Sequence, residues 1–194
     1  MGTIQPYLLG NLPEDKSWEL FKRVAFNDQL EEPNEDFMSI GKEIIKKCGN
    51  VPLAIRTIAG LLYSRNTVQE WMYFRDREIA SIEQTPTDIM PTLKISYHHL
   101  QPEQKQCFAY CALFQKDHRF DVQMLTMLWM AQGFVKSLDD GRICFLELLR
   151  RCFFQNLNIG IGFEEKETCQ MHDLMHDLAQ MVGDECLLVD SPSE

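Results

Sequence analysis

The sequence predicts a mostly α-helical fold, in which a small helical bundle is followed by a winged-helix domain with one short β-hairpin. Three observations predict this fold. Apolar residues recur at helical spacing through most of the chain, proline and glycine interrupt them at short intervals, and one alternating apolar stretch appears late in the sequence. The 194 residues are 45% apolar and 25% charged, which is typical of a globular protein with a substantial core.

Four helical segments occupy the first half of the chain. The first begins at Pro13 with acidic residues in its first turn, and the second ends at Gly49, a natural helix stop. The third begins at Pro52 and is apolar nearly all round, so we expect it to be the most buried helix. The fourth covers residues 68–83. Because the links between these helices are short, we expect an antiparallel bundle over about residues 10–85.

A change in composition separates the two halves. The stretch "QTPTDIMP" carries two prolines within six residues and marks a domain boundary. The sequence therefore predicts a helical domain over residues 1–88, a winged-helix domain over residues 89–185 and a tail or linker over residues 186–194.

The predicted winged-helix domain begins with two helices separated by a turn at Gln101 and Pro102. Asp121 caps a third helix, which ends at Gly133. The stretch "GRICFLELLRRC" predicts a further helix. Residues 153–161 then alternate between apolar and polar, and a polar return strand leads to the last helix, as expected for a β-hairpin.

Charge and cysteine content limit the classes of function. The net charge of −10 opposes binding to duplex DNA and to anionic lipid, and no strong basic cluster offsets it. Seven cysteines without a C-x-x-C pair indicate a reducing compartment. No apolar run is long enough to span a membrane, and the N-terminus lacks the regions of a signal peptide. We therefore expect a cytoplasmic protein without direct membrane insertion.

The stretch "MHDLMHD" brings two histidines into i, i+4 spacing and differs by one residue from the zinc-protease motif H-E-x-x-H. However, Asp173 is one methylene shorter than the glutamate of that motif, and no histidine follows His176. We therefore expect no metal site here. On local evidence alone, the alternative to a ligand role is that His172 and His176 are structural or helix-capping residues.

Two other activities are disfavoured. The candidate recognition helix of the winged-helix domain, residues 122–132, contains no lysine or arginine, which favours a packing module over a DNA-binding one. The phosphate-loop pattern G-x-x-x-x-G-K-[ST] is absent, so the chain is not expected to hydrolyse nucleotides, and no catalytic residue is predicted. A standalone winged-helix interaction or nucleic-acid-binding protein remains the alternative.

Taken together, five stretches resemble one family. They occur in the order found in plant nucleotide-binding leucine-rich-repeat disease-resistance proteins of the coiled-coil type, and the resemblance covers roughly residues 1–185. The stretches are "GNLPEDKSWELFKRVAF", "KKCGNVPLAIRTIAGLL", "ISYHHLQPEQKQCFAYCALFQKD", "LTMLWMAQGFV" and "CQMHDLMHDLAQ". The chain resembles the helical ARC subdomain and the winged-helix subdomain of the NB-ARC module, and its opening resembles a point inside that module.

The resemblance implies two site residues. The stretch "CGNVPL" is similar to the family's GLPL motif, in which the proline packs against adenine, and this assigns Pro52 to the adenine. The first "MHD" is similar to the MHD motif, whose histidine meets the β-phosphate of bound ADP, and this assigns His172 to the phosphate. Asp173 is expected to cap the helix that follows. The second copy of the motif is not expected to form another site.

The resemblance also implies a function. The chain would be the C-terminal part of a nucleotide-dependent switch that contributes ADP contacts and relays conformational change in plant defence signalling. ADP or ATP would bind in the complete parent protein, whose nucleotide-binding domain and leucine-rich repeats are the expected partners, with oligomerisation on activation. The phosphate-loop domain is not part of this sequence, so we expect the chain alone to bind ADP weakly or not detectably.

Overall fold

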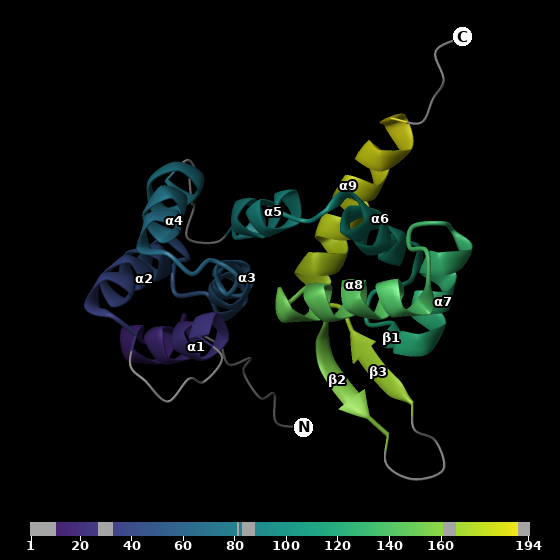
Figure 1. The fold of residues 1–194 in the computed structure, drawn as a ribbon, viewed down its shortest axis with the longest axis horizontal. Helices are drawn as coiled ribbons and strands as arrows, with labels where there is room; N and C mark the ends of the chain where they lie inside the picture. Colours follow the sequence, from purple (N-terminus) through teal and green to yellow (C-terminus); the bar gives the residue numbers. More distant parts are fainter. Residues whose placement is uncertain (1–10, 27–32, 81, 83–87, 161–165, 190–194) are drawn as a thin grey trace, which may run out of the picture.

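The computed structural model describes residues 11–26, 33–80, 82, 88–160 and 166–189, the last six of these by their backbone only. The described chain forms two lobes with separate hydrophobic cores (Figure 1). We call the part before residue 81 the helical lobe and the part from residue 89 onward the winged-helix lobe. These lobes correspond to the two predicted halves, and the boundary at residues 88 and 89 stays a prediction.

The helical lobe contains the four predicted helical segments, here α1 (Glu14–Phe26), α2 (Glu35–Lys47), α3 (Pro52–Leu62) and α4 (Val68–Tyr73), which continues as the π-helical turn η1 (Phe74–Ile79). Eight of the eleven residues of α3 are buried, more than in α1, α2 or α4, which confirms that α3 is the most buried helix of this lobe. A capping box between Thr67 and Glu70 explains why α4 begins where it does.

The winged-helix lobe is built around a larger apolar core. Its helices are α5 (Met90–His98), α6 (Pro102–Tyr110) with the short 3₁₀ turn η2 (Cys111–Leu113), α7 (Val122–Ala131), α8 (Leu138–Arg150) and α9 (Asp173–Val189). The Asp121 carboxylate accepts a hydrogen bond of 3.0 Å from the Met124 amide, which confirms the predicted cap of α7. Ser137 caps α8, so this helix begins three residues before Gly141, where the sequence pattern had suggested its start.

The described chain forms one antiparallel sheet of three strands in the order β1-β3-β2. The predicted hairpin is confirmed by the pairing of β2 (Gln155–Ile159) with β3 (Glu167–Gln170); residues 161–165 lie outside the described residues. A third strand, β1 (Arg119–Asp121), pairs with the other side of β3 and was not predicted. The helix α9 continues to Val189, into the segment that the sequence suggested as a tail.

The order of elements corrects the proposed recognition helix. The helices α7 and α8 pack together, and Gly141 of α8 approaches Thr126 of α7 closely. In a helix-turn-helix pair the second helix is the reading helix, and here the second helix, directly before the hairpin, is α8. Residues 122–132 were therefore the wrong segment for this role. Within the described ranges, no helix combines the length and apolar character needed to cross a bilayer.

Candidate functional site

His172 occupies the junction between β3 and α9. The strand ends at Gln170, Met171 is buried in the winged-helix core, and α9 begins at Asp173. The His172 carbonyl accepts hydrogen bonds from the amides of Met175 and His176, at 2.8 and 2.9 Å. His172 is therefore the residue that starts the helix, and its side chain is only partly buried.

The helix cap is His172 itself, and this corrects the role expected of Asp173. The imidazole Nδ1 of His172 accepts a hydrogen bond of 3.2 Å from the Leu174 amide, and this satisfies one of the N–H groups that every helix leaves free at its start. Asp173 is exposed at the first helical position. The histidine can accept from the amide of Leu174, the second residue of α9, because its Nδ1 occupies the position of the side-chain oxygen in an asparagine cap.

This hydrogen bond determines which nitrogen of the His172 ring carries the proton. A backbone amide can only donate, so Nδ1 is the acceptor and the neutral ring is protonated at Nε2. The Nε2–H group is consequently left as a donor at the start of α9. The free amides of the same helix end also favour an anion.

His176 has a different environment. It is 4% exposed, and its Nε2 donates a hydrogen bond of 2.7 Å to the Phe114 carbonyl. Its Nδ1 is buried without a hydrogen-bond partner among the described residues. His176 therefore joins α9 to the end of η2 as a core residue. Nowhere in the described part of the chain do histidine, cysteine and carboxylate side chains form a group of three that could hold a metal ion.

Pro52 is the first residue of α3 and is exposed. The turn before it is made by Gly49 and Asn50, which have φ angles of +60° and +56°. Asparagine adopts this left-handed conformation more readily than most residues, which explains how Asn50 is tolerated there. Leu53, next to Pro52, packs against the winged-helix core, so the first turn of α3 lies at the boundary between the lobes.

We call this boundary the seam and define it by the residues whose polar groups interact along it: Gly60, Arg65, Glu78, His99, Glu147, Arg150 and Arg151. Arg150 donates a hydrogen bond of 2.7 Å to the Gly60 carbonyl, so the end of α8 is bound to α3. Within the winged-helix lobe, Arg151 donates one of 3.0 Å to the His99 carbonyl. Sequence reasoning missed the whole seam.

Two carboxylates hold the arginines of the seam in place. Glu147 accepts hydrogen bonds from Arg150 and Arg151, at 2.6 and 2.8 Å. Burial by itself would raise the pKa of the Glu147 carboxyl, but these arginines hold it below its usual value. Glu78 binds Arg65 at 3.3 Å and also contacts the His99 ring. The seam is thus a network of ion pairs around a close helix contact.

The sheet register relates His172 to the seam. Gln155 pairs with Gln170 at the end of the ladder between β2 and β3. The two strands are antiparallel, so the segment just before β2 lies beside the segment just after β3. The first segment is Cys152 to Phe154, and the second is Met171 and His172. Cys152 directly follows the seam arginines.

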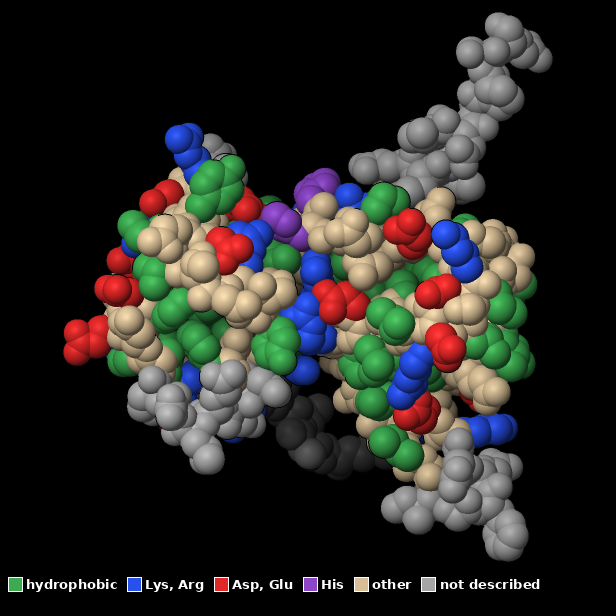
Figure 2. Space-filling view, viewed as in Figure 1, with side chains coloured by type: hydrophobic (Ala, Val, Ile, Leu, Met, Phe, Trp, Pro, Cys, Tyr) green, Lys and Arg blue, Asp and Glu red, His purple; other side chains and the backbone are tan. Residues whose placement is uncertain are grey.

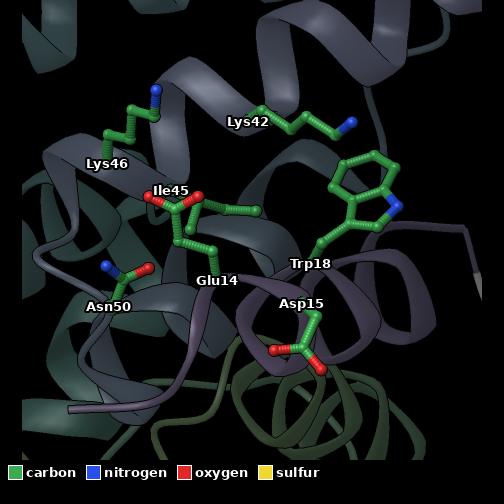
Figure 3. A pocket seen from close by; sticks show the side chains of 7 residues that line it. All are labelled: Glu14, Asp15, Trp18, Lys42, Ile45, Lys46 and Asn50. Carbon is green, nitrogen blue, oxygen red and sulfur yellow. The ribbon is translucent and has the colours of Figure 1, made fainter.

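A surface cavity of about 400 Å³ lies elsewhere, on the helical lobe (Figure 3). It contains neither Pro52 nor His172. The residues that line it come from the start of α1, the second half of α2 and the turn before α3, and they are Glu14, Asp15, Trp18, Lys42, Ile45, Lys46 and Asn50. Since two carboxylates offset the two lysines, the cavity has no net charge that would select an anion or a cation.

Comparison with known proteins gives consistent matches. Residues 113–179 match the family described as the disease resistance protein winged helix domain. The chain is 45% identical over 185 residues to disease resistance protein RGA2 of Solanum bulbocastanum, an alignment that covers 92% of this chain and 19% of that protein. It is 30% identical over 185 residues to disease resistance protein RPP13 of Arabidopsis thaliana, covering 92% and 22%. The chain spans about a fifth of the length of these relatives.

Proposed function

We propose a function from the premise that this chain is homologous to one segment of plant disease resistance proteins and contains their winged-helix domain. In this proposal the chain is the C-terminal part of an NB-ARC nucleotide-dependent switch. It contributes two contacts to ADP, from Pro52 to the adenine and from His172 to the β-phosphate. It performs no catalysis and relays conformational change in defence signalling.

The observation that carries the proposal is the hydrogen bond between His172 and Leu174. It leaves the Nε2–H group of the imidazole as a donor at a helix start, where free amides also favour a phosphate. A hydrogen bond to a charged acceptor contributes about 1.5–3 kcal/mol. A single such contact is modest, which agrees with the expectation that the isolated chain binds ADP weakly or not detectably.

The two proposed contacts belong to different lobes. Pro52 begins α3 of the helical lobe and His172 precedes α9 of the winged-helix lobe. A ligand held by both lobes binds best while the lobes stay together, so it shifts the population towards the closed arrangement. The hydrogen bond from Arg150 to the Gly60 carbonyl and the contact between Glu78 and His99 join the two lobes and stabilise the same arrangement. Exchange of ADP for ATP would then favour rotation of the winged-helix lobe and oligomerisation.

The remaining parts of the nucleotide site would come from the partners in the complete protein. The phosphate loop and the leucine-rich repeats are not in this sequence. In this proposal the chain supplies the contacts of Pro52 and His172, which cover the nucleotide and hold the lobes together. The nucleotide-binding domain supplies the main binding site for the phosphates.

The alternative, a nucleic-acid-binding winged helix, finds less support. The helix α8 contains Arg142 and Arg150, but Arg142 pairs with Glu167 and Arg150 with Glu147. Cations that already have acidic partners contribute little to phosphate binding. In a gel-shift assay with mixed-sequence duplex at low salt, we expect no shift. A salt-sensitive shift would support this alternative instead.

A pair of variants at His172 tests the proposed function in the complete parent protein. His172→Asn keeps an acceptor for the Leu174 amide but removes the Nε2–H donor, whereas His172→Ala removes both. His98→Ala, at an exposed histidine of the same lobe, is the control. We expect both His172 variants to retain less ADP through purification and to raise resting signalling. Unchanged ADP content and resting activity in the His172→Asn protein would refute the contact.

A further inference from the structure

The arginines around the seam are not equivalent. Arg65 pairs with Glu78, while Arg150 and Arg151 pair with Glu147. A fourth, Arg56 of α3, is exposed and has no carboxylate partner among the residues that the structure describes. Figure 2 shows cationic side chains gathered along the boundary between the two lobes.

Arg56 lies one helical turn after Pro52. Residues four apart share a face of a helix, and both of these side chains are exposed, whereas the intervening Ala54 and Ile55 are buried. The exposed face of α3 that begins with Pro52 therefore continues with a cation.

The guanidinium of Arg56 lies beside the Cys152 thiol. Burial raises the pKa of this thiol, and the positive charge of Arg56 partly offsets the effect. Cys152 belongs to the segment that leaves the sheet next to the chain leading to His172. Arg56 thus extends from the helical lobe to the part of the winged-helix lobe that carries the proposed phosphate donor.

We propose that Arg56, beside the seam, is an anion-binding residue and that, with His172, it holds the phosphates of a nucleoside diphosphate. This inference rests on the proposed function. An arginine fork can form two parallel hydrogen bonds to phosphate oxygens, while the histidine provides a single N–H. The two groups come from different lobes, so a diphosphate between them would connect the lobes at a second point besides the adenine.

In the experiment, this chain is titrated with inorganic pyrophosphate at constant ionic strength. Heteronuclear NMR of the arginine side chains measures the binding. We expect the Nε–H resonance of Arg56 to shift and saturate in the millimolar range. The variant Arg56→Gln should weaken the apparent affinity about tenfold. The matched control is Arg75→Gln, because Arg75 is already paired with Asp76 and Glu43. We expect Arg75→Gln to leave the affinity unchanged.

Several results would overturn the assignment of Arg56. These are the absence of a saturable shift, equal shifts at Arg75, or an Arg56→Gln variant that binds like the unaltered chain. The melting temperature of Arg56→Gln should match that of the unaltered chain, since no ion pair is removed. A loss of pyrophosphate binding in this variant would then not be caused by unfolding.

The same titration with ADP and the variant His172→Asn separates this inference from the proposed function. If His172→Asn weakens ADP binding and Arg56→Gln does not, Arg56 is no ligand and the proposed function stands. If Arg56→Gln weakens pyrophosphate and ADP binding and His172→Asn changes neither, the seam binds anions but the proposed role of His172 fails. Weakening by both variants supports both.

Discussion

The carbonyl oxygen of Gly60 accepts a hydrogen bond of 2.7 Å from the guanidinium of Arg150, and this joins helices that lie ninety residues apart in sequence. The approach is close because Gly60 has no side chain. A Cβ atom at this position would lie 2.6 Å from the carbonyl oxygen of Arg150, which is rigid backbone. The glycine therefore sets the distance between the two lobes.

Substitution of Gly60 by alanine should disrupt this contact. The added methyl group forces α3 and the end of α8 apart, and we expect a loss of about 1–3 kcal/mol in the free energy of unfolding, measured by urea denaturation. The control is Gly183→Ala in α9, whose added Cβ would meet its nearest neighbour at 3.9 Å. We expect the control to be neutral or more stable by up to about 1 kcal/mol. Equal stability of the two variants would contradict the close contact.

Removal of the Glu147 charge should destabilise the seam in a pH-dependent way. At pH 7, Glu147→Gln should lose about 1–3 kcal/mol, because Arg150 and Arg151 lose a charged acceptor. The pKa of Glu147 is lowered in the folded chain, so its contribution is present above the unfolded pKa of about 4.3 and disappears as the pH falls through the folded pKa.

Urea denaturation between pH 3 and pH 7 measures this effect. The difference between the unaltered chain and Glu147→Gln should shrink towards pH 3. The exposed Glu43→Gln variant should differ by less than about 0.5 kcal/mol throughout. A difference for Glu147→Gln that does not depend on pH would disprove the ionic role of this residue.

Alkaline pH should destabilise the fold through its buried thiols. Burial raises the pKa of Cys48 to about 12, whereas an unfolded thiol ionises near about 8.5. Above that value the unfolded chain has lost a proton that the folded chain keeps, so stability falls with rising pH by at most about 1.4 kcal/mol per unit for this thiol. Under reducing conditions, Cys48→Ala should therefore flatten the decline between pH 9 and pH 11. Parallel curves for the two proteins would show that Cys48 ionises equally in both states.

The cap formed by His172 makes a prediction for this chain alone. His172→Ala should lower the free energy of unfolding by about 0.5–2 kcal/mol, the usual effect of losing an N-cap. His172→Asn should restore most of this loss, because an asparagine oxygen can accept from the Leu174 amide. Asp173→Ala should have a smaller effect than His172→Ala, in urea denaturation at pH 7. The reverse order would mean that Asp173 is the cap after all.

The helices could be predicted because their signals are local. Asp121 and Gly49 mark helix ends through the chemistry of single residues, and the apolar spacing of α3 alone indicates its burial. The β2–β3 hairpin was found for the same reason. The strand β1 was missed because three residues contain no periodicity, and it forms only through pairing with β3.

The seam could not be predicted because its contacts join residues distant in sequence. Nothing around Gly60 indicates a partner at Arg150, and nothing around Glu78 indicates His99. The junction at His172 was predicted in place but not in detail. Aspartate is a common cap, so Asp173 was the natural choice, and only the geometry of the ring reveals that the histidine caps the helix.

The proposed contact between His172 and ADP is tested most directly by a structure of the complete parent protein with ADP bound. We expect the Nε2 atom of His172 to lie about 2.7–3.2 Å from a β-phosphate oxygen, with Nδ1 still accepting from the Leu174 amide. A β-phosphate bound elsewhere, or a His172 ring turned away from it, would show that His172 is not a ligand of ADP.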